Sequence, residues 1–124
     1  MRTALIIEDS LEIRENTAEI LEIAGYRVVI ATNGHEGIAL AAGTVPDIIL
    51  CDIMMPGVNG YDVLTTLKAN SVTAQIPFVY VTASAEKKEV KMALDLGADG
   101  YISKPFDDED LMETIEGLLG KEAF

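Results

Sequence analysis

Basic side chains are scarce in this chain. Nine lysines and arginines stand against 21 aspartates and glutamates, so the formal net charge at pH 7 is −12. A protein that binds duplex nucleic acid directly needs clustered basic side chains for its phosphate contacts. The charge therefore argues against direct nucleic-acid binding and favours a protein that meets basic surfaces or metal cations.

Cysteine, histidine and long apolar runs are also scarce. The single cysteine, Cys51, cannot form an internal disulfide, and His35 is the only histidine, so a phosphodonor histidine within the chain is not expected. No apolar stretch reaches the length that spans a membrane. Met1 leads directly into an expected strand, so we expect no signal peptide, no membrane attachment and a cytoplasmic location.

Length and hydropathy together indicate a folded domain. The chain has 124 residues, of which 49% are hydrophobic. That length suffices for one sizeable core, and that hydrophobic content is too high for a disordered chain. We find no linker, repeat or low-complexity segment, so we expect residues 1–124 to form a single domain.

Short apolar runs alternate five times with segments of helical periodicity. Strands are predicted at Thr3–Glu8, Arg27–Ala31, Asp47–Asp52, Pro77–Thr82 and Gly100–Ser103. Helices are predicted over Ile13–Ala24, from Asn33 to near Gly43, around Val63–Leu67, from about Ala85 to Gly97, and over Asp107–Leu119. Asn33 and Glu36 have the spacing of a capping box.

The predicted strands are almost continuously apolar instead of alternating between apolar and polar residues. That pattern is typical of strands covered on both faces, and therefore of a parallel sheet. Five βα units with right-handed crossovers build a doubly wound, three-layer sandwich. We therefore predict an α/β fold of flavodoxin-like strand order 2-1-3-4-5.

Polar side chains stand directly after most of these strands. In doubly wound sheets, ligands bind at the carboxyl ends of the strands. The predicted strand order brings Glu8, Asp9 and Asp52 into one crevice. Thr82 and Lys104 then lie on the other side of Asp52. We therefore expect one functional site at this edge of the sheet.

The residue types in this crevice suggest metal-assisted phosphoryl transfer. Clustered carboxylates repel one another, and a hard divalent cation relieves that repulsion. A site made of oxygen ligands suits Mg²⁺ better than it suits zinc or iron. A carboxylate such as Asp52 can accept a phosphoryl group as an acyl phosphate. The negative charge of that group then needs neutralisation by the cation, the Lys104 ammonium and the Thr82 hydroxyl. The small Ala83 leaves room for its approach.

Each of these residues also has an ordinary structural interpretation. Asp9 or Ser10 could cap the first helix, Thr82 could simply favour a strand, and Lys104-Pro105 could form a turn. Their joint occurrence at the matching ends of four strands favours the functional interpretation.

The whole chain resembles the receiver domain of two-component response regulators. The resemblance is carried by Glu8-Asp9, Asp52 with Met55-Pro56 and Gly60, Thr82-Ala83, Gly97-Ala98-Asp99, Tyr101, and Lys104-Pro105-Phe106. It implies a phosphorylatable signalling switch and not an enzyme. It also implies a sensor histidine kinase or phosphotransfer protein as the phosphodonor to Asp52, and a downstream protein that the sequence does not name.

The same resemblance implies the metal ligands. Asp9, Asp52 and the backbone carbonyl of Met54 would bind Mg²⁺ directly. Glu8 would act through a water molecule. The resemblance further implies that Lys104 pairs with phosphorylated Asp52 and that the Lys104-Pro105 peptide bond is cis.

A conformational switch is also implied by the resemblance. Thr82 would move toward the phosphoryl group and Tyr101 would rotate inward, changing the surface formed by the fourth helix, fifth strand and fifth helix. In the DNA-binding branch of this family, arginines of the last helix pair across an activated dimer. Here that helix has no basic residue before Lys121, so an arginine-paired dimer is not favoured.

Two alternatives remain open at the level of sequence. The chain could be a receiver module of a longer transcription regulator or hybrid histidine kinase. A phosphatase-type enzyme with an aspartyl-phosphate intermediate is a minor alternative, but such enzymes need a second acid where this chain has Met54. A flavodoxin needs a glycine- and hydroxyl-rich phosphate loop, where this chain has the acidic Glu8-Asp9-Ser10-Leu11.

Overall fold

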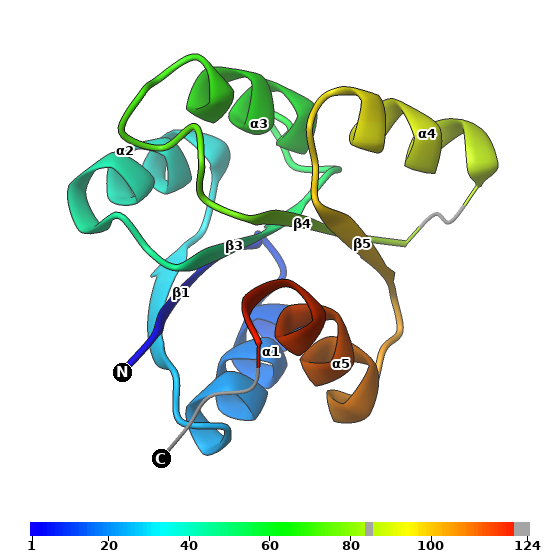
Figure 1. The fold of residues 1–124 in the computed structure, drawn as a ribbon. Coiled ribbons are helices and arrows are strands. Elements are labelled where there is room, and N and C mark those ends of the chain that lie inside the picture. Colours follow the sequence, from blue (N-terminus) through cyan, green and yellow to red (C-terminus); the bar gives the residue numbers. More distant parts are fainter. Residues whose placement is uncertain (84–85, 121–124) are drawn as a thin grey trace.

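Five strands alternate with five helices in the computed structural model, which describes residues 1–83 and 86–120 (Figure 1). The elements are β1 Thr3–Ile7, α1 Leu11–Ile23, β2 Arg27–Ala31, α2 Gly34–Thr44, β3 Ile48–Asp52, α3 Gly60–Lys68, β4 Phe78–Thr82, α4 Lys87–Asp95, β5 Gly100–Ser103 and α5 Asp108–Leu119. The predicted alternation is confirmed, and several element ends differ from the prediction by one or two residues. The expected helix start near Ala85, like Lys121, lies outside the described residues.

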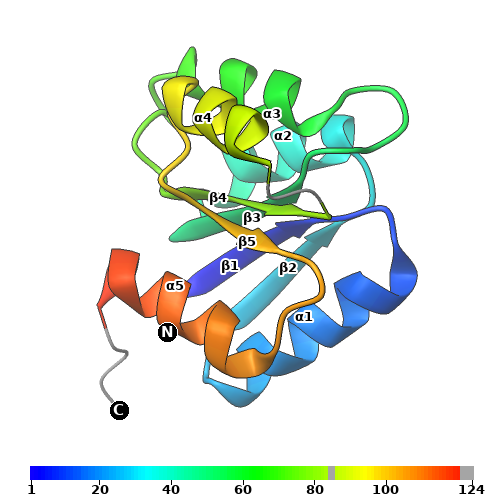
Figure 2. The same cartoon turned by 90° about the vertical axis from the view of Figure 1, so that its right-hand side faces the viewer.

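The sheet is entirely parallel and has the order β2-β1-β3-β4-β5, which confirms the flavodoxin-like prediction. Helices α1 and α5 cover one face, and α2, α3 and α4 cover the other (Figures 1 and 2). Successive strand residues enter opposite cores. Ile6 and Leu50 pack with Leu111 of α5, whereas Ile7 and Cys51 pack on the side of α3. The domain is therefore a three-layer sandwich.

The central strands explain why the sequence pattern is continuously apolar. All five residues of β3 and all five of β4 are buried, because each strand has helices on both faces. Asp52 is the last residue of β3 and is only 6% exposed. A carboxylate in that place is unfavourable unless other groups compensate its charge.

The capping residue of α2 and the glycine after α1 lie where the sequence predicts, but the capping box of α2 differs in one hydrogen bond. The Asn33 side chain accepts a hydrogen bond from the Glu36 N–H at 2.9 Å, as the capping-box spacing predicts. The Glu36 carboxylate, however, accepts from the N–H of Thr32, one residue before the cap. Gly25 follows α1 with a φ of 96°, the left-handed conformation that glycine favours after a helix. Within residues 1–83 and 86–120, no helix has both the length and the hydropathy needed to cross a membrane.

Helix α3 is fixed to the carboxyl end of β3. A Cβ atom on Gly60 would lie 2.5 Å from the backbone oxygen of Asp52 and 2.7 Å from the Cα of Ile53. The Gly60 N–H donates to the Ile53 carbonyl at 2.9 Å. The buried Tyr80 hydroxyl donates to the Gly60 carbonyl, also at 2.9 Å. The beginning of α3 therefore packs directly against the backbone that carries Asp52.

We predict that Gly60→Ala lowers the free energy of unfolding by about 1–3 kcal/mol, because the added methyl group meets backbone atoms that cannot rotate away. Gly43→Ala is the matched control. A Cβ atom at Gly43, in α2, would have no described atom outside its own helix within 4 Å, so alanine there should stabilise by up to about 1 kcal/mol. Urea unfolding of both variants measures the difference; equal midpoints would contradict the close packing at Gly60.

Candidate functional site

Three carboxylates meet where β1 and β3 end. The two strands are hydrogen-bonded neighbours, with Ile7 opposite Cys51, so the residues that follow, Glu8 and Asp52, come side by side. One carboxylate oxygen each from Glu8, Asp9 and Asp52 lies within 4.8 Å of the others. Glu8 and Asp52 are buried, whereas Asp9 is exposed. The predicted acidic cluster is confirmed.

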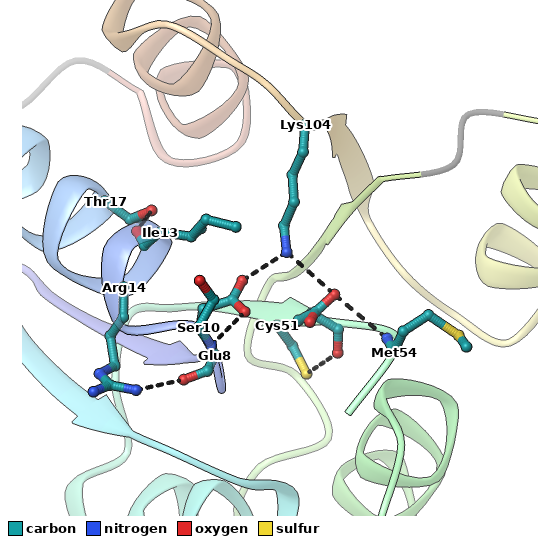
Figure 3. A network of polar contacts seen from close by, with 9 residues as sticks. Glu8, Ser10, Ile13, Arg14, Thr17, Cys51, Met54 and Lys104 are labelled. Atoms are coloured by element: carbon teal, nitrogen blue, oxygen red, sulfur yellow. Dashed lines mark hydrogen bonds and ion pairs between the residues drawn. The ribbon is translucent and has the colours of Figure 1, made fainter. Parts of the chain in front are cut away.

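Lys104 joins this cluster from the end of β5. Its N–H donates to the Thr82 carbonyl at 2.8 Å, which fixes its backbone beside β4. The Nζ atom lies 2.9 Å from Glu8 Oε1 and 3.4 Å from Asp52 Oδ1 (Figure 3). The Lys104-Pro105 peptide bond is cis, as the resemblance implies. In this structure the ammonium group therefore bridges two buried carboxylates and lies closer to Glu8.

The loop between β1 and α1 is organised by Glu8. Its Oε2 accepts a hydrogen bond from the Ser10 N–H at 3.2 Å, and its carbonyl accepts one from Arg14 Nη1 at 3.1 Å (Figure 3). Ser10 is the N-cap residue of α1, but among the described residues its side chain makes no capping hydrogen bond. Ser10 therefore occupies the expected N-cap position, but without the side-chain hydrogen bond of a capping serine.

The acidic cluster fits a magnesium site. Glu8, Asp9 and Asp52 offer only oxygen donors, which Mg²⁺ prefers. A single ammonium group, that of Lys104, bridges two of these three carboxylates, so excess negative charge remains. The exposed carboxylate of Asp9 gives a cation access from solvent. A divalent cation would neutralise the excess charge.

The Asp52 carboxyl group has a raised pKa. Burial, and then the negative charge of Glu8, raise the pKa of Asp52 from 3.8 to about 6. Lys104 and the Met54 N–H, which donates to Asp52 Oδ1 at 3.4 Å, oppose this rise without cancelling it. Burial also raises the pKa of the neighbouring Cys51 thiol well above its ordinary value. Cys51 therefore remains a neutral core residue, as expected.

A cavity of about 490 Å³ opens beside Asp52. Its lining consists of Asp52, Ile53, Met54, Tyr61, Thr82, Ala83, Glu89 and Lys104. The structure thus brings together the predicted residues Thr82, Ala83 and Lys104 around Asp52. Tyr61 and Glu89 were not predicted as site residues. They reach the cavity from α3 and α4, and no spacing in the sequence reveals which side chains of two adjacent helices face a common cavity.

Two other predicted residues have different positions. Tyr101 lies on β5 outside this cavity and is 41% exposed. It lines a second cavity of about 290 Å³ together with Lys87, Val90, Lys91, Leu94 and Asp95 of α4. His35 is exposed on α2, as expected for a residue outside the site.

The fold and the site define an α/β domain with an acidic cluster at the carboxyl edge of a flavodoxin-like sheet. The family model of the response regulator receiver domain matches residues 4–116. The chain therefore belongs to the response regulator receiver domain family and is a receiver domain of the two-component type.

Known relatives support the same assignment. The response regulator SaeR of Staphylococcus aureus (strain USA300) is 40% identical over 119 residues, covering 96% of this chain and 51% of SaeR. The chain thus spans about half the length of the curated relatives it matches. The chemotaxis protein CheY4 of Vibrio cholerae superposes with a TM-score of 0.91 at 29% identity, covering 95% of this chain and 98% of CheY4.

A second solved structure bears on the metal. The receiver domain of the sensor histidine kinase PA1611 from Pseudomonas aeruginosa PAO1 superposes with a TM-score of 0.89 at 25% identity, covering 96% of this chain and 98% of that one. That structure contains a magnesium ion coordinated in its active-site cleft.

We predict that Asp52→Asn raises the free energy of unfolding by about 1–2 kcal/mol at pH 7 without divalent cations. Because the folded-state pKa of Asp52 is raised to about 6, its protonation favours the folded state. That contribution is complete below pH 3.8 and is lost as the pH rises through about 6. The neutral asparagine keeps it at pH 7, so its advantage should shrink toward pH 4.

Urea unfolding between pH 4 and pH 8 measures this effect. Glu22→Gln is the control, because Glu22 is exposed on α1 and its replacement removes the same formal charge. An Asp52→Asn variant no more stable than Glu22→Gln at pH 7 would contradict the raised pKa of Asp52.

Proposed function

We propose that Asp52 accepts a phosphoryl group from a phosphohistidine of the cognate kinase or of a phosphotransfer protein. The observation that carries this proposal is the position of the Asp52 carboxylate. It is buried at the end of β3, lies 3.4 Å from the Lys104 ammonium, and opens into a cavity with room for a phosphoryl group. Acceptor, positive charge and space therefore occur together.

We further propose that the acidic cluster holds Mg²⁺ during the transfer. Asp9, Asp52 and the Met54 carbonyl would be direct ligands, and Glu8 would act through water. The magnesium bound in the PA1611 receiver domain supports this assignment. When bound, the ion supplies positive charge that neutralises part of the phosphoryl group's negative charge.

The protein side chains then have separate roles in the transfer. A carboxylate oxygen of Asp52 forms the new O–P bond while the donor's N–P bond breaks, and the imidazole nitrogen keeps the bonding electron pair. The Lys104 ammonium pairs with the phosphoryl oxygens as its contact with Glu8 loosens. The Thr82 hydroxyl donates to another phosphoryl oxygen. Ala83 keeps the approach open because it is small.

The proposed output is a change of the surface formed by α4, β5 and α5. Thr82 and Tyr101 lie on the adjacent strands β4 and β5, where Tyr80 is opposite Tyr101 and Thr82 opposite Ser103. Tyr101 is 41% exposed in this structure, so an inward rotation would remove apolar surface from solvent. A coupling free energy of about 1–3 kcal/mol would suffice to bias such a switch.

We propose that residues 1–124 act as one receiver domain whose output depends on protein contacts. The first turn of α5 contains Asp108, Glu109 and Asp110, and no lysine or arginine occurs in α5. An arginine-paired dimer is therefore not favoured. A receiver module within a longer regulator remains compatible with relatives about twice as long, and the mass of the full gene product distinguishes the two cases.

We expect incubation with acetyl phosphate and Mg²⁺ to add one phosphoryl group, measured by intact-mass spectrometry. Asp52→Asn should abolish the addition, because the acceptor oxygen is lost, and chelation of Mg²⁺ should strongly reduce it. Asp62→Asn is the control, since Asp62 is an exposed aspartate of α3 outside the cavity. Phosphorylation that survives the Asp52 change would disprove the assignment.

Lys104→Ala should still allow phosphorylation of Asp52 but should abolish the response of α4 and β5. The physical reason is that the phosphoryl group then lacks the ammonium partner that holds it against β5. Amide NMR shifts of Tyr101 and of α4, compared with and without phosphodonor, measure the response. A phosphorylated Lys104→Ala variant with wild-type shift changes would show that the switch does not need this lysine.

A further inference from the structure

Glu89 gives the cavity beside Asp52 a negative charge that lies outside the acidic cluster. We propose that Glu89, placed beside Tyr61 in the cavity wall, selects against phosphodonors of higher negative charge. This inference rests on the proposed function of Asp52 as phosphoacceptor. Glu89 is thereby a specificity-determining residue, since it acts on the donor's charge and not on the bonds that change.

The placement of Glu89 comes from two helices that meet at the cavity. Glu89 lies in the first turn of α4, and Tyr61 is the second residue of α3. Both side chains line the same cavity of about 490 Å³ as Asp52, Thr82 and Lys104. A phosphoryl group carried to Asp52 therefore enters a space whose wall contains the Glu89 carboxylate.

Tyr61 is held in position by its neighbours. Its ring packs edge-to-face on Tyr80, with ring centroids 5.7 Å apart and an interplanar angle of 64°. Tyr80 is fully buried, and its hydroxyl donates to the carbonyl of Gly60, the residue before Tyr61. The packing of Tyr61 on the buried Tyr80 thus positions this part of the cavity wall.

Electrostatics support the proximity of Tyr61 and Glu89. Burial, and then the negative charge of Glu89, raise the pKa of the Tyr61 hydroxyl. The hydroxyl therefore stays protonated and carries no positive charge that would neutralise the Glu89 carboxylate. Glu89 thus keeps a formal negative charge that acts on an incoming anion.

Small phosphodonors of different charge test this idea. Acetyl phosphate is a dianion at pH 7, and phosphoramidate is a monoanion. With acetyl phosphate, the bond between the bridging oxygen and phosphorus breaks, and acetate leaves with the electron pair. With phosphoramidate, the N–P bond breaks and the nitrogen leaves as ammonia. In both reactions the new O–P bond forms to Asp52, so the donors differ chiefly in charge and leaving group.

The experiment measures both phosphorylation rates, with saturating Mg²⁺, for the wild type and for Glu89→Gln. We expect the acetyl phosphate rate to rise about three- to tenfold when the charge of Glu89 is removed. The ratio of the acetyl phosphate rate to the phosphoramidate rate should rise about two- to threefold, because the monoanion gains about half the interaction energy of the dianion. Comparing each variant with the wild type cancels the difference in leaving group.

Three variants serve as controls. Glu89→Asp keeps the charge and should retain the wild-type ratio. Glu86→Gln removes a charge from the N-cap of the same helix, where Glu86 is exposed and outside the described cavity lining, so it should also retain that ratio. Glu89→Ala removes the charge without adding an amide group and should match Glu89→Gln.

The outcomes separate this inference from the proposed function. A wild-type protein that neither donor phosphorylates at Asp52 overturns the proposed function and this inference with it. A phosphorylated wild type whose rate ratio is unchanged in Glu89→Gln and Glu89→Ala overturns this inference alone. The same holds if Glu86→Gln changes the ratio as much as Glu89→Gln does.

Discussion

The ion pair that Lys104 makes with two buried carboxylates is the interaction on which this domain depends. Its Nζ atom contacts Glu8 at 2.9 Å and Asp52 at 3.4 Å, and so joins the ends of β1, β3 and β5. Burying one carboxylate without compensation costs several kcal/mol. The parallel register brings two such groups side by side, and the strand that supplies the lysine completes the arrangement. The order of the strands in the sheet therefore determines which charged groups meet at the site.

The Lys104 ammonium compensates these carboxylates only in part. Burial, and then the negative charge of Glu8, raise the pKa of Asp52 to about 6, and Lys104 opposes this rise without cancelling it. A sequence selected only for stability would replace Asp52 with a neutral residue. Retaining the charge leaves the site suited to a cation and to a phosphoryl acceptor.

Much of the fold and of the acidic site could be predicted from sequence. In a parallel sheet of known strand order, the position of a residue along its strand determines which residues of the neighbouring strands lie beside it. Residues that end neighbouring strands must meet, which is why Glu8, Asp52 and Lys104 could be placed together. Helix-to-helix contacts follow no such rule. The meeting of Tyr61 and Glu89 depends on how α3 and α4 pack, and the closer approach of Lys104 to Glu8 depends on local geometry.

The cavity beside Asp52 has one firmly held wall and one weakly held wall. Helix α3 buries Gly60, Val63, Leu64 and Leu67, whereas α4 buries only Ala93. A helix that buries so little has few apolar contacts to lose, so we expect its local opening free energy to lie below that of global unfolding. Two arrangements of α4 that differ little in free energy would coexist as populations. A partner that binds one form responds to how often that form occurs, and even a small change in free energy at Asp52 alters that frequency.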